Sequence, residues 1–293
     1  MITINAFLNG VLDDFREYVK TQRKLCNLLD AHFDAGKIPD YSDEHIQQLY
    51  LLRYAYAYAF EYKYIYAKLI KNFGLHDKVK VTSVGCGNLL DYWSLVHAVK
   101  ENCDICYRGA DAINWSYKIP LRTRDDVKWF IGDVVSLFQD EQNFSSDIYI
   151  FPKSISELSN NKVHRLAECF TKDNISKDVI HFVFSLRTDH GSMKRDTTKT
   201  KILYDRLVEC GFHTNDKSEI YWGFRDSKEK KLIREMDDDF HHPGDIVNYL
   251  EELYTKCASF DDCFVASDCK KRLSRLPILK CKYAAWQIFT FER

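Results

Sequence analysis

Two glycines, Gly85 and Gly87, stand where a run of β-branched residues gives way to an apolar segment with helical spacing. Val79–Val84 predicts a strand and Leu89–Lys100 predicts a helix, so a Gly-Cys-Gly turn joins a strand to a helix start. Glycine lets a ligand approach the backbone closely, and a helix start offers free N–H groups. The pattern is typical of a nucleotide-binding loop, although the same turn also ends many ordinary strands.

The elements that position this turn alternate in period along the chain. Strands are expected at Ile105–Gly109, Val127–Ile131, Asp147–Phe151 and Val179–Leu186, and helices at Val134–Phe138, Lys162–Phe170 and Thr200–Cys210. Such alternation predicts a doubly wound parallel sheet with right-handed crossovers.

The last part of the chain predicts two further strands. One is expected around Ser218–Phe224, and Tyr283–Phe291 is rich in β-forming residues. Because a long polar insertion separates them, we expect the last strand to run antiparallel beside the sixth. The expected fold class is therefore α/β, with a doubly wound, seven-stranded, mostly parallel sheet and an antiparallel last strand.

Residues 1–77 predict helices throughout. An apolar repeat four residues apart runs through Phe7, Val11, Phe15 and Val19, a second helix is expected over Thr21–Ala35, and Ser42-Asp43 begins a third. We therefore expect a helical N-terminal region to precede the sheet.

Five tyrosines lie four residues apart within the third helix, at Tyr50, Tyr54, Tyr58, Tyr62 and Tyr66. On a helix this spacing makes one aromatic stripe. The favoured interpretation is a helix packed on the domain, because aromatic stripes at this spacing usually belong to a core. A cap over the ligand loop remains the alternative.

Residues from about Val79 to Arg293 resemble the class I S-adenosylmethionine-dependent methyltransferases. The resemblance rests on the Gly85-Cys86-Gly87 loop after the first strand, Asp111 after the second and Asp133 after the third, together with the antiparallel last strand. It implies a Rossmann-like domain over 78–293 with an insertion at about 225–280, preceded by the helical cap region 1–77.

The resemblance also implies S-adenosyl-L-methionine as the cofactor. Its amino-acid part would meet the backbone of Gly85, Cys86 and Gly87, and its ribose hydroxyls would bind Asp111, because an ionised carboxylate accepts two hydroxyls well. The remaining cofactor-binding residues implied are Ala112, Asp133, Val134, Phe151 and Pro152. As alternatives, Asp111 is a solvated loop acid and Asp133 a helix N-cap.

Methyl transfer needs aligned reactants and, for a protonated acceptor, a general base. The segment after the fourth strand offers Glu157 and Ser154 as catalytic candidates. An equally weighted interpretation makes Ser154 or Ser156 a helix cap and Glu157 a complement to the positive end of that helix.

The chain departs from the family pattern at several positions. Ser83 stands where many members have an acidic residue, and Phe151-Pro152-Lys153-Ser154 replaces the Asn/Asp-Pro-Pro-aromatic motif of amino-group methyltransferases. The methyl acceptor, a small molecule or a macromolecule, is therefore open. The alternatives to a methyltransferase are a non-catalytic cofactor-binding module of the same fold and, less favoured, a nicotinamide-dependent oxidoreductase.

Composition limits the partners and the compartment. Lys+Arg 42 against Asp+Glu 43 gives a net charge of −1, which carries no strong nucleic-acid signal. Ten cysteines are scattered singly, and those in the insertion lack zinc-site spacing, so no metal is expected. With no signal peptide or bilayer-spanning run, we expect a cytoplasmic protein that does not enter the membrane.

Overall fold

The computed structural model describes residues 3–31, 38–74, 77–140, 145–171, 174–187, 190–223, 242–258, 266–279 and 285–293. The chain divides into two compact units. Unit 1 comprises Met1–Phe60, Trp115–Pro120 and Asp238–Cys281, and unit 2 comprises Glu61–Asn114, Leu121–Asp237 and Lys282–Arg293. The predicted domains, 1–77 and 78–293 with an insertion at 225–280, remain a prediction.

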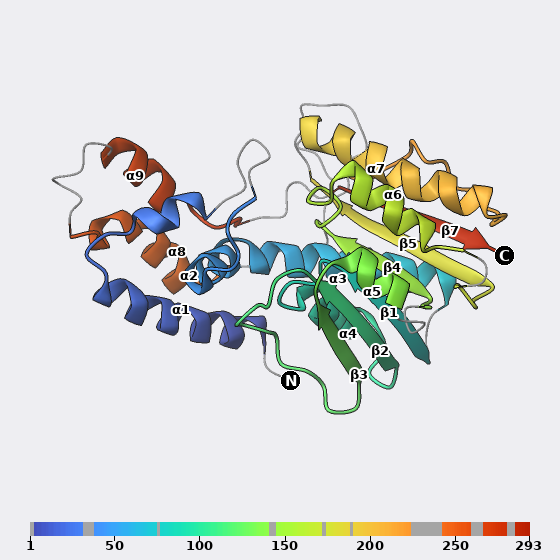
Figure 1. The fold of residues 1–293 in the computed structure, drawn as a ribbon. Coiled ribbons are helices and arrows are strands. Elements are labelled where there is room, and N and C mark those ends of the chain that lie inside the picture. Colours follow the sequence, from blue (N-terminus) through green and yellow to red (C-terminus); the bar gives the residue numbers. More distant parts are fainter. Residues whose placement is uncertain are drawn as a thin grey trace. The chain divides into compact units, whose positions relative to one another are not determined.

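Unit 2 is built on one sheet with the strand order β3-β2-β1-β4-β5-β7-β6 (Figure 1). The strands are β1 (Lys78–Val84), β2 (Asp104–Asp111), β3 (Asp126–Ile131), β4 (Ile148–Pro152), β5 (Val179–Leu186), β6 (Trp222–Gly223) and β7 (Ala285–Glu292). The first five pair in parallel, whereas β7 runs antiparallel to both β5 and β6.

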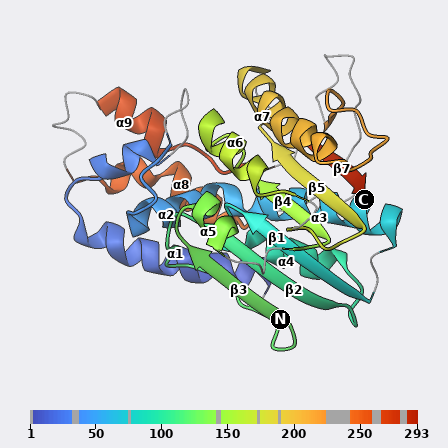
Figure 2. The same cartoon turned by 45° about the vertical axis from the view of Figure 1, so that its right-hand side comes forward.

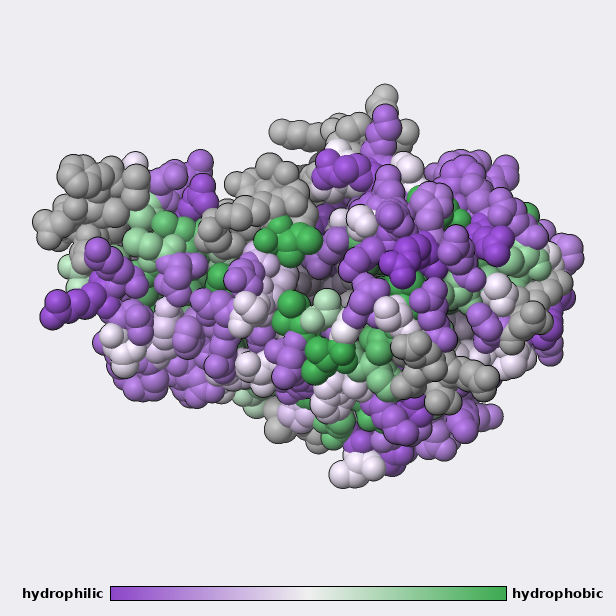
Figure 3. All heavy atoms as spheres, viewed as in Figure 1, coloured by the Kyte–Doolittle hydropathy of each residue, from purple (hydrophilic) through white to green (hydrophobic). Residues whose placement is uncertain are grey.

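Helices cover both faces of this sheet (Figures 1 and 2). On one face lie α5 (Val134–Asp140), α6 (Asn160–Glu168) and α7 (His190–Glu209), and α4 (Leu90–Ala98) lies on the other with the later turns of α3 (Tyr56–Phe73). Both α6 and α7 present mostly hydrophilic residues outward (Figure 3) while Val163, Leu166 and Leu203 are buried. The sheet is therefore doubly wound, as β–α alternation requires.

The side chains of strand β5 pack against helices on both faces of the sheet. Phe182 and Phe184 join the apolar core beneath α6 and α7, where Phe184 stacks on Phe151 with ring centroids 4.8 Å apart. The residues that alternate with them, including His181, face the opposite side, where the ring centroid of His181 lies 4.3 Å from that of Phe73 in α3. Because successive strand residues point to opposite faces, a near-continuous apolar run is needed in a strand that is covered on both.

The predicted α/β class, the mostly parallel sheet, its antiparallel last strand and the preceding helices are confirmed. The sixth strand is much shorter than predicted. Of the expected span 218–224, only Trp222–Gly223 forms a strand, and residue 224 lies outside the described residues. Six strands thus have five residues or more, and the edge strand β6 has two.

The N-terminal residues form α1 (Ile4–Thr21), a 3-10 helix (Cys26–Asp30) and α2 (Glu44–Tyr50). As predicted, Asp43 begins α2, because its carboxylate accepts from the backbone N–H groups of His45 and Ile46. The second predicted helix, Thr21–Ala35, is wrong over 22–25, which is not helical, and only the short 3-10 helix follows. Residues 32–35 lie outside the described part.

A π-helical turn, Leu51–Ala55, continues α2 into α3, so the tyrosine stripe lies on nearly continuous helical backbone. Tyr54, Tyr62 and Tyr66 are 9%, 3% and 0% exposed, in agreement with the core interpretation, whereas Tyr50 and Tyr58 are only partly buried. The boundary between the two units falls within α3, between Phe60 and Glu61.

Two helices from the C-terminal part of the chain, α8 (Gly244–Glu251) and α9 (Ala266–Leu273), belong to unit 1. The guanidinium of Arg53, whose residue is 1% exposed, donates through Nη2 to the carbonyl oxygens of Arg272 (2.9 Å) and Leu273 (3.1 Å) at the end of α9. Burial lowers the pKa of Arg53 to about 10. Residues more than 200 positions apart in sequence therefore share one core.

Candidate functional site

The order of the strands reverses between β1 and β4, which are neighbours in the sheet although two strands separate them in sequence. In doubly wound sheets, ligands bind outside the carboxyl ends of the strands at such a switch point. The turn after β1 and the turn after β4 therefore flank the expected site, and both contain residues selected from the sequence.

The turn after β1 is held in left-handed backbone conformations. Gly85 has φ 74°, Gly87 has φ 53° and Leu89 has φ 69°. The N–H groups of Gly85 (2.7 Å) and Cys86 (3.2 Å) donate to the carbonyl oxygen of Ala110 in β2. Glycine is favoured at 85 and 87 because side chains are strained at these dihedrals, and at 85 a Cβ would also clash with Cβ of Ser154.

Asp111 closes this loop onto β2. One carboxylate oxygen accepts from the N–H of Gly87 (2.7 Å), and the other accepts from the N–H of Ile113 (2.8 Å). Ala112 lies exposed between these two attachments. The structure thus brings Gly85, Cys86, Gly87, Asp111 and Ala112 together, and their contact with a cofactor stays a prediction.

Asn88 was not singled out from the sequence. It follows the second glycine, is 3% exposed, and its buried side-chain Nδ2 has no hydrogen-bond partner among the described residues. The polar side chain of Asn88 beside a Gly-x-Gly turn could have indicated a ligand contact. However, an asparagine in a turn more often stabilises the turn itself.

Ser154 fastens the turn after β4 to the turn after β1. Its hydroxyl donates to the carbonyl oxygen of Val84, and its side chain occupies the space that a Cβ on Gly85 would need. The residue Ser154 is 7% exposed and its hydroxyl is bonded to Val84, so it helps to hold the loop in place. A catalytic role for Ser154 stays a prediction.

Asp133 and Val134 stand between β3 and α5. Asp133 accepts from the N–H of Ser136 (3.4 Å) and pairs with Lys162 (2.7 Å between Oδ1 and Nζ). Hydrogen bonding to Lys162 lowers the pKa of Asp133, so it is ionised near neutral pH. These contacts agree with the helix-cap interpretation, and an adenine contact for either residue stays a prediction.

Phe151 and Pro152 end β4. The ring of Phe151 is fully buried in the core, so any ligand contact by Phe151 would come from its backbone. Pro152 is only partly buried.

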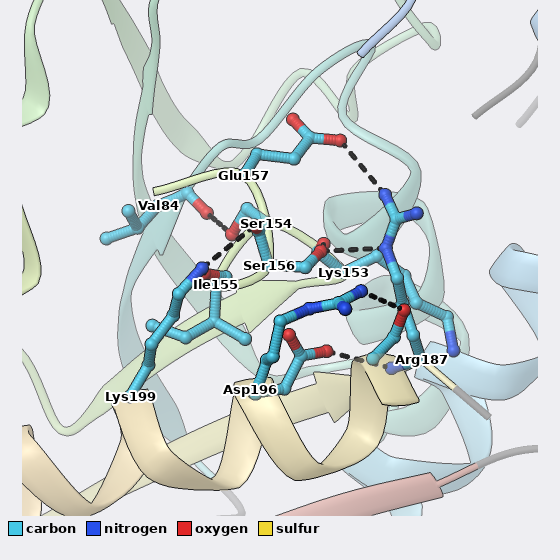
Figure 4. Close-up of polar contacts among 11 residues, drawn as sticks. Val84, Lys153, Ser154, Ile155, Ser156, Glu157, Arg187, Asp196 and Lys199 are labelled. Carbon is cyan, nitrogen blue, oxygen red and sulfur yellow. Dashed lines mark hydrogen bonds and ion pairs between the residues drawn. The ribbon is translucent and has the colours of Figure 1, made fainter. Parts of the chain in front are cut away.

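Glu157 lies in the turn that follows β4, with its N–H bonded to the carbonyl oxygen of Ser154 (2.9 Å). Its carboxylate meets Nη2 of Arg187 at 3.4 Å, and Nε of Arg187 donates to the hydroxyl of Ser156 at 2.8 Å (Figure 4). Burial raises the pKa of Glu157 to about 7, opposed by Arg187 and helped by the negative charge of Asp111. Since 34% of the side chain is exposed, water offsets part of this shift.

Two residues of α7 hold this region from one side (Figure 4). Nζ of Lys199 donates to the carbonyl oxygens of Ile155 (3.1 Å) and Ser156 (2.9 Å). The carboxylate of Asp196, whose residue is 1% exposed, accepts from the N–H of Arg187 at 3.3 Å. These contacts tie the turn after β4 to the end of β5.

A buried ion pair missed by the sequence analysis lies at the end of β4. Nζ of Lys153 is 2.7 Å from Oε1 of Glu61 in α3, and the hydroxyl of Ser185 in β5 donates to the same oxygen at 2.5 Å. Lys153 has φ 60°, an unusual value for a residue with a side chain. Glu61 and Lys153 are 92 residues apart, so no local pattern could have paired them.

A second buried carboxylate, Asp91, was also missed. It is 0% exposed in the first turn of α4, and the hydroxyl of Tyr107 donates to both of its oxygens at 2.9 and 3.0 Å. Burial raises the pKa of Asp91 to about 6.

The described residues contain no group of three or more His, Cys, Asp or Glu side chains placed to hold a metal ion. Within the same residues, no helix is long and apolar enough to cross a membrane.

No protein-family model and no curated protein sequence matches this chain. Among solved structures, it is similar to a SAM-dependent methyltransferase from Archaeoglobus fulgidus at 12% identity, covering 79% of this chain and 94% of that one with a TM-score of 0.38. It is also similar to the cyclopropane synthase MmaA2 from Mycobacterium tuberculosis (10% identity, 94% and 98% covered, TM-score 0.41).

A third similar structure is a SAM-dependent methyltransferase from Geobacter sulfurreducens in complex with S-adenosyl-L-homocysteine. The identity is 10%, 78% of this chain and 91% of that chain are covered, and the TM-score is 0.35. All three TM-scores lie below 0.5.

Proposed function

We propose that this chain binds S-adenosyl-L-methionine at the carboxyl edge of its sheet and transfers the methyl group to an acceptor. The observation that carries the proposal is the loop Gly85–Gly87, which lies at the switch point between β1 and β4 and is closed by Asp111. The proposal is supported by the contact between the glycine loop after β1 and the acidic residue that ends the neighbouring β2. The antiparallel last strand of the sheet also fits the resemblance.

The residues present suit the cofactor chemically. Each oxygen of the Asp111 carboxylate accepts one backbone N–H, and a carboxylate oxygen has a second lone pair for a ribose hydroxyl. The orphaned Nδ2 of Asn88 is a donor in the same loop. We assign the cofactor contacts to Gly85, Cys86, Gly87, Asp111, Ala112, Asp133 and Val134, with the backbones of Phe151 and Pro152 beside the transferred methyl.

When bound, the cofactor would supply a methyl group on a positively charged sulfur; the acceptor would bond to the methyl carbon, and the sulfur would leave as a neutral thioether. The chain then has to orient the acceptor and, for a protonated nucleophile, remove a proton. Glu157 is the proposed base because it follows β4, remains partly exposed and has a pKa that desolvation raises toward the range in which a base works best. Ser154 positions this turn through the carbonyl of Val84.

The test is a calorimetric titration of the purified chain with S-adenosyl-L-methionine, S-adenosyl-L-homocysteine and NAD. We expect the first two to bind at one site and NAD to produce no heat of binding. Binding of NAD alone would favour the nicotinamide-dependent oxidoreductase instead. Binding without methyl transfer to any acceptor would favour the non-catalytic module.

A further inference from the structure

The turn after β4 contains the carboxylate of Glu157, which interacts electrostatically with Asp111 of the proposed cofactor site. Ser154 packs against Gly85, and the N–H of Glu157 bonds to the carbonyl oxygen of Ser154 at 2.9 Å. The negative charge of Asp111, which holds the N–H of Gly87, acts on the Glu157 carboxyl group. Glu157 therefore belongs to the same edge of the sheet as the loop.

The charges that face Glu157 come from three elements. Arg187 follows β5, Asp111 ends β2, and Asp196 and Lys199 lie on α7. Two further cations act on these groups, namely Lys153 on Asp196 and Arg195 on Lys199. Lys199 is directed to carbonyl oxygens, and Oδ1 of Asp196 has no hydrogen-bond partner among the described residues. The surrounding charges thus leave no net negative field, and a preference for a cationic ligand would come from Glu157 itself.

The ion pair between Glu157 and Arg187 leaves the Glu157 carboxylate accessible to a ligand. The contact with Arg187 is long, at 3.4 Å, and Arg187 makes a shorter bond to Ser156, at 2.8 Å. The side chain of Glu157 is 34% exposed, whereas that of Arg187 is 18% exposed. The carboxylate is thus held in place without being enclosed.

We propose that Glu157 is a specificity-determining residue that favours the sulfonium cofactor over the demethylated product through its negative charge. This inference rests on the proposed function. The two ligands differ by one methyl group and one positive charge on sulfur, so a nearby carboxylate separates their affinities. A preference for the sulfonium cofactor would help the demethylated product to leave after transfer. It would also help a new cofactor molecule to bind.

The inference predicts how the preference depends on pH. A cation binds best to the ionised carboxylate, so the affinity for the sulfonium ligand should rise as Glu157 loses its proton and level off above about pH 7. The affinity for the neutral thioether should lack this rise. Because water offsets part of the shift, the midpoint should fall between the usual glutamate value, about 4.3, and 7.

The experiment measures both dissociation constants by calorimetry from about pH 5 to about pH 8, for the wild-type chain and for Glu157→Gln. In the wild type, we divide the dissociation constant of S-adenosyl-L-homocysteine by that of S-adenosyl-L-methionine. This ratio should increase about tenfold over the pH range. In Glu157→Gln the ratio should stay low and flat. Glu168→Gln, at an exposed glutamate near the end of α6, is the matched control and should behave as the wild type.

Two further measurements test the role of Glu157 without relying on the Glu157→Gln variant alone. Arg187→Gln removes the opposing cation and should move the ratio above about pH 7 in the opposite direction to Glu157→Gln. Sinefungin, which has an amine in place of the sulfonium methyl, should follow the pH dependence of the charged ligand. Binding of both ligands with a ratio that Glu157→Gln leaves unchanged would overturn the inference alone. Binding of neither would contradict the proposed function as well.

Discussion

At the scale of single residues, Asp111 has the most direct test. Its carboxylate both closes the loop through Gly87 and provides the proposed ribose contact. Asp111→Ala should weaken S-adenosyl-L-homocysteine binding by about one to two decades, because losing hydrogen bonds to a charged acceptor costs ~1.5–3 kcal/mol. Titration calorimetry gives the value.

The matched control for this change is Asp104→Ala. Asp104 begins the same strand, is exposed and lies at the opposite end of β2 from the loop. Its replacement should leave the dissociation constant unchanged. An Asp111→Ala variant that binds as tightly as the control would return Asp111 to the role of a loop acid.

Asp91 should make folding stability depend on pH in an unusual direction. Burial raises its pKa from 3.8 to about 6, so the folded state favours the protonated form. This contribution is fully present below about pH 4 and is lost as pH rises through about 6, by ~3 kcal/mol, at 1.36 kcal/mol per pKa unit.

The measurement for Asp91 is urea unfolding of the wild type and Asp91→Asn between about pH 4 and about pH 7. The neutral variant lacks this titration, so its stability relative to the wild type should improve as pH rises. Equal pH profiles for the two proteins would show that Asp91 titrates alike in the folded and unfolded chains.

At the scale of elements, the pair Glu61–Lys153 joins α3 to the end of β4. Lys153→Met leaves the Glu61 carboxylate buried without its cation, which should lower the free energy of unfolding by ~3–5 kcal/mol. The double variant Lys153→Met with Glu61→Gln removes both charges and should recover part of this loss. Denaturant unfolding of the single and double variants measures the coupling.

An additive double variant would contradict this account of the pair. In that case the stability cost of Lys153→Met would come from lost packing, because the side chain is 10% exposed and its stem is largely buried. Lys201→Met, at a well-exposed lysine of α7, is the control for removing a charge from the surface.

The sequence predicted those elements whose signal is local. The strand β5 has the predicted bounds, 179–186, because both faces are covered and its apolar run is continuous. The loop at Gly85 was identified because its conformation needs glycine. Glu61 was indistinguishable from the solubilising charges of a long helix, since its partner lies on a distant strand.

The edge of the sheet at β6 was predicted less well than its centre. β6 has two residues where seven were expected, because an edge strand has a partner on one side only and its pattern is weakly constrained. Likewise, nothing in the sequence indicated that Trp115–Pro120 groups with the N-terminal helices. Both features depend on contacts between distant residues, which periodicity does not encode.

At the scale of the whole molecule, ligand binding should appear as thermal stabilisation. A ligand that binds only the folded chain adds ~2.7 kcal/mol when present at about 100 times its dissociation constant. For a chain of this size, this raises the melting temperature on the order of 5 °C. S-adenosyl-L-homocysteine should produce this shift in a thermal melt and NAD should not. A shift with NAD alone would contradict the proposed cofactor.

The composition of unit 1 has a consequence for how the protein is made. Its core needs both the helices before Phe60 and the segment Asp238–Cys281, to which the guanidinium of Arg53 bonds at the end of α9. A ribosome adds ~5–20 residues per second, so the nascent N-terminal helices wait on the order of 10–40 s for these partners to emerge. Throughout that interval their apolar faces are open to chaperones, whereas the first four strands of unit 2 can already begin to pair.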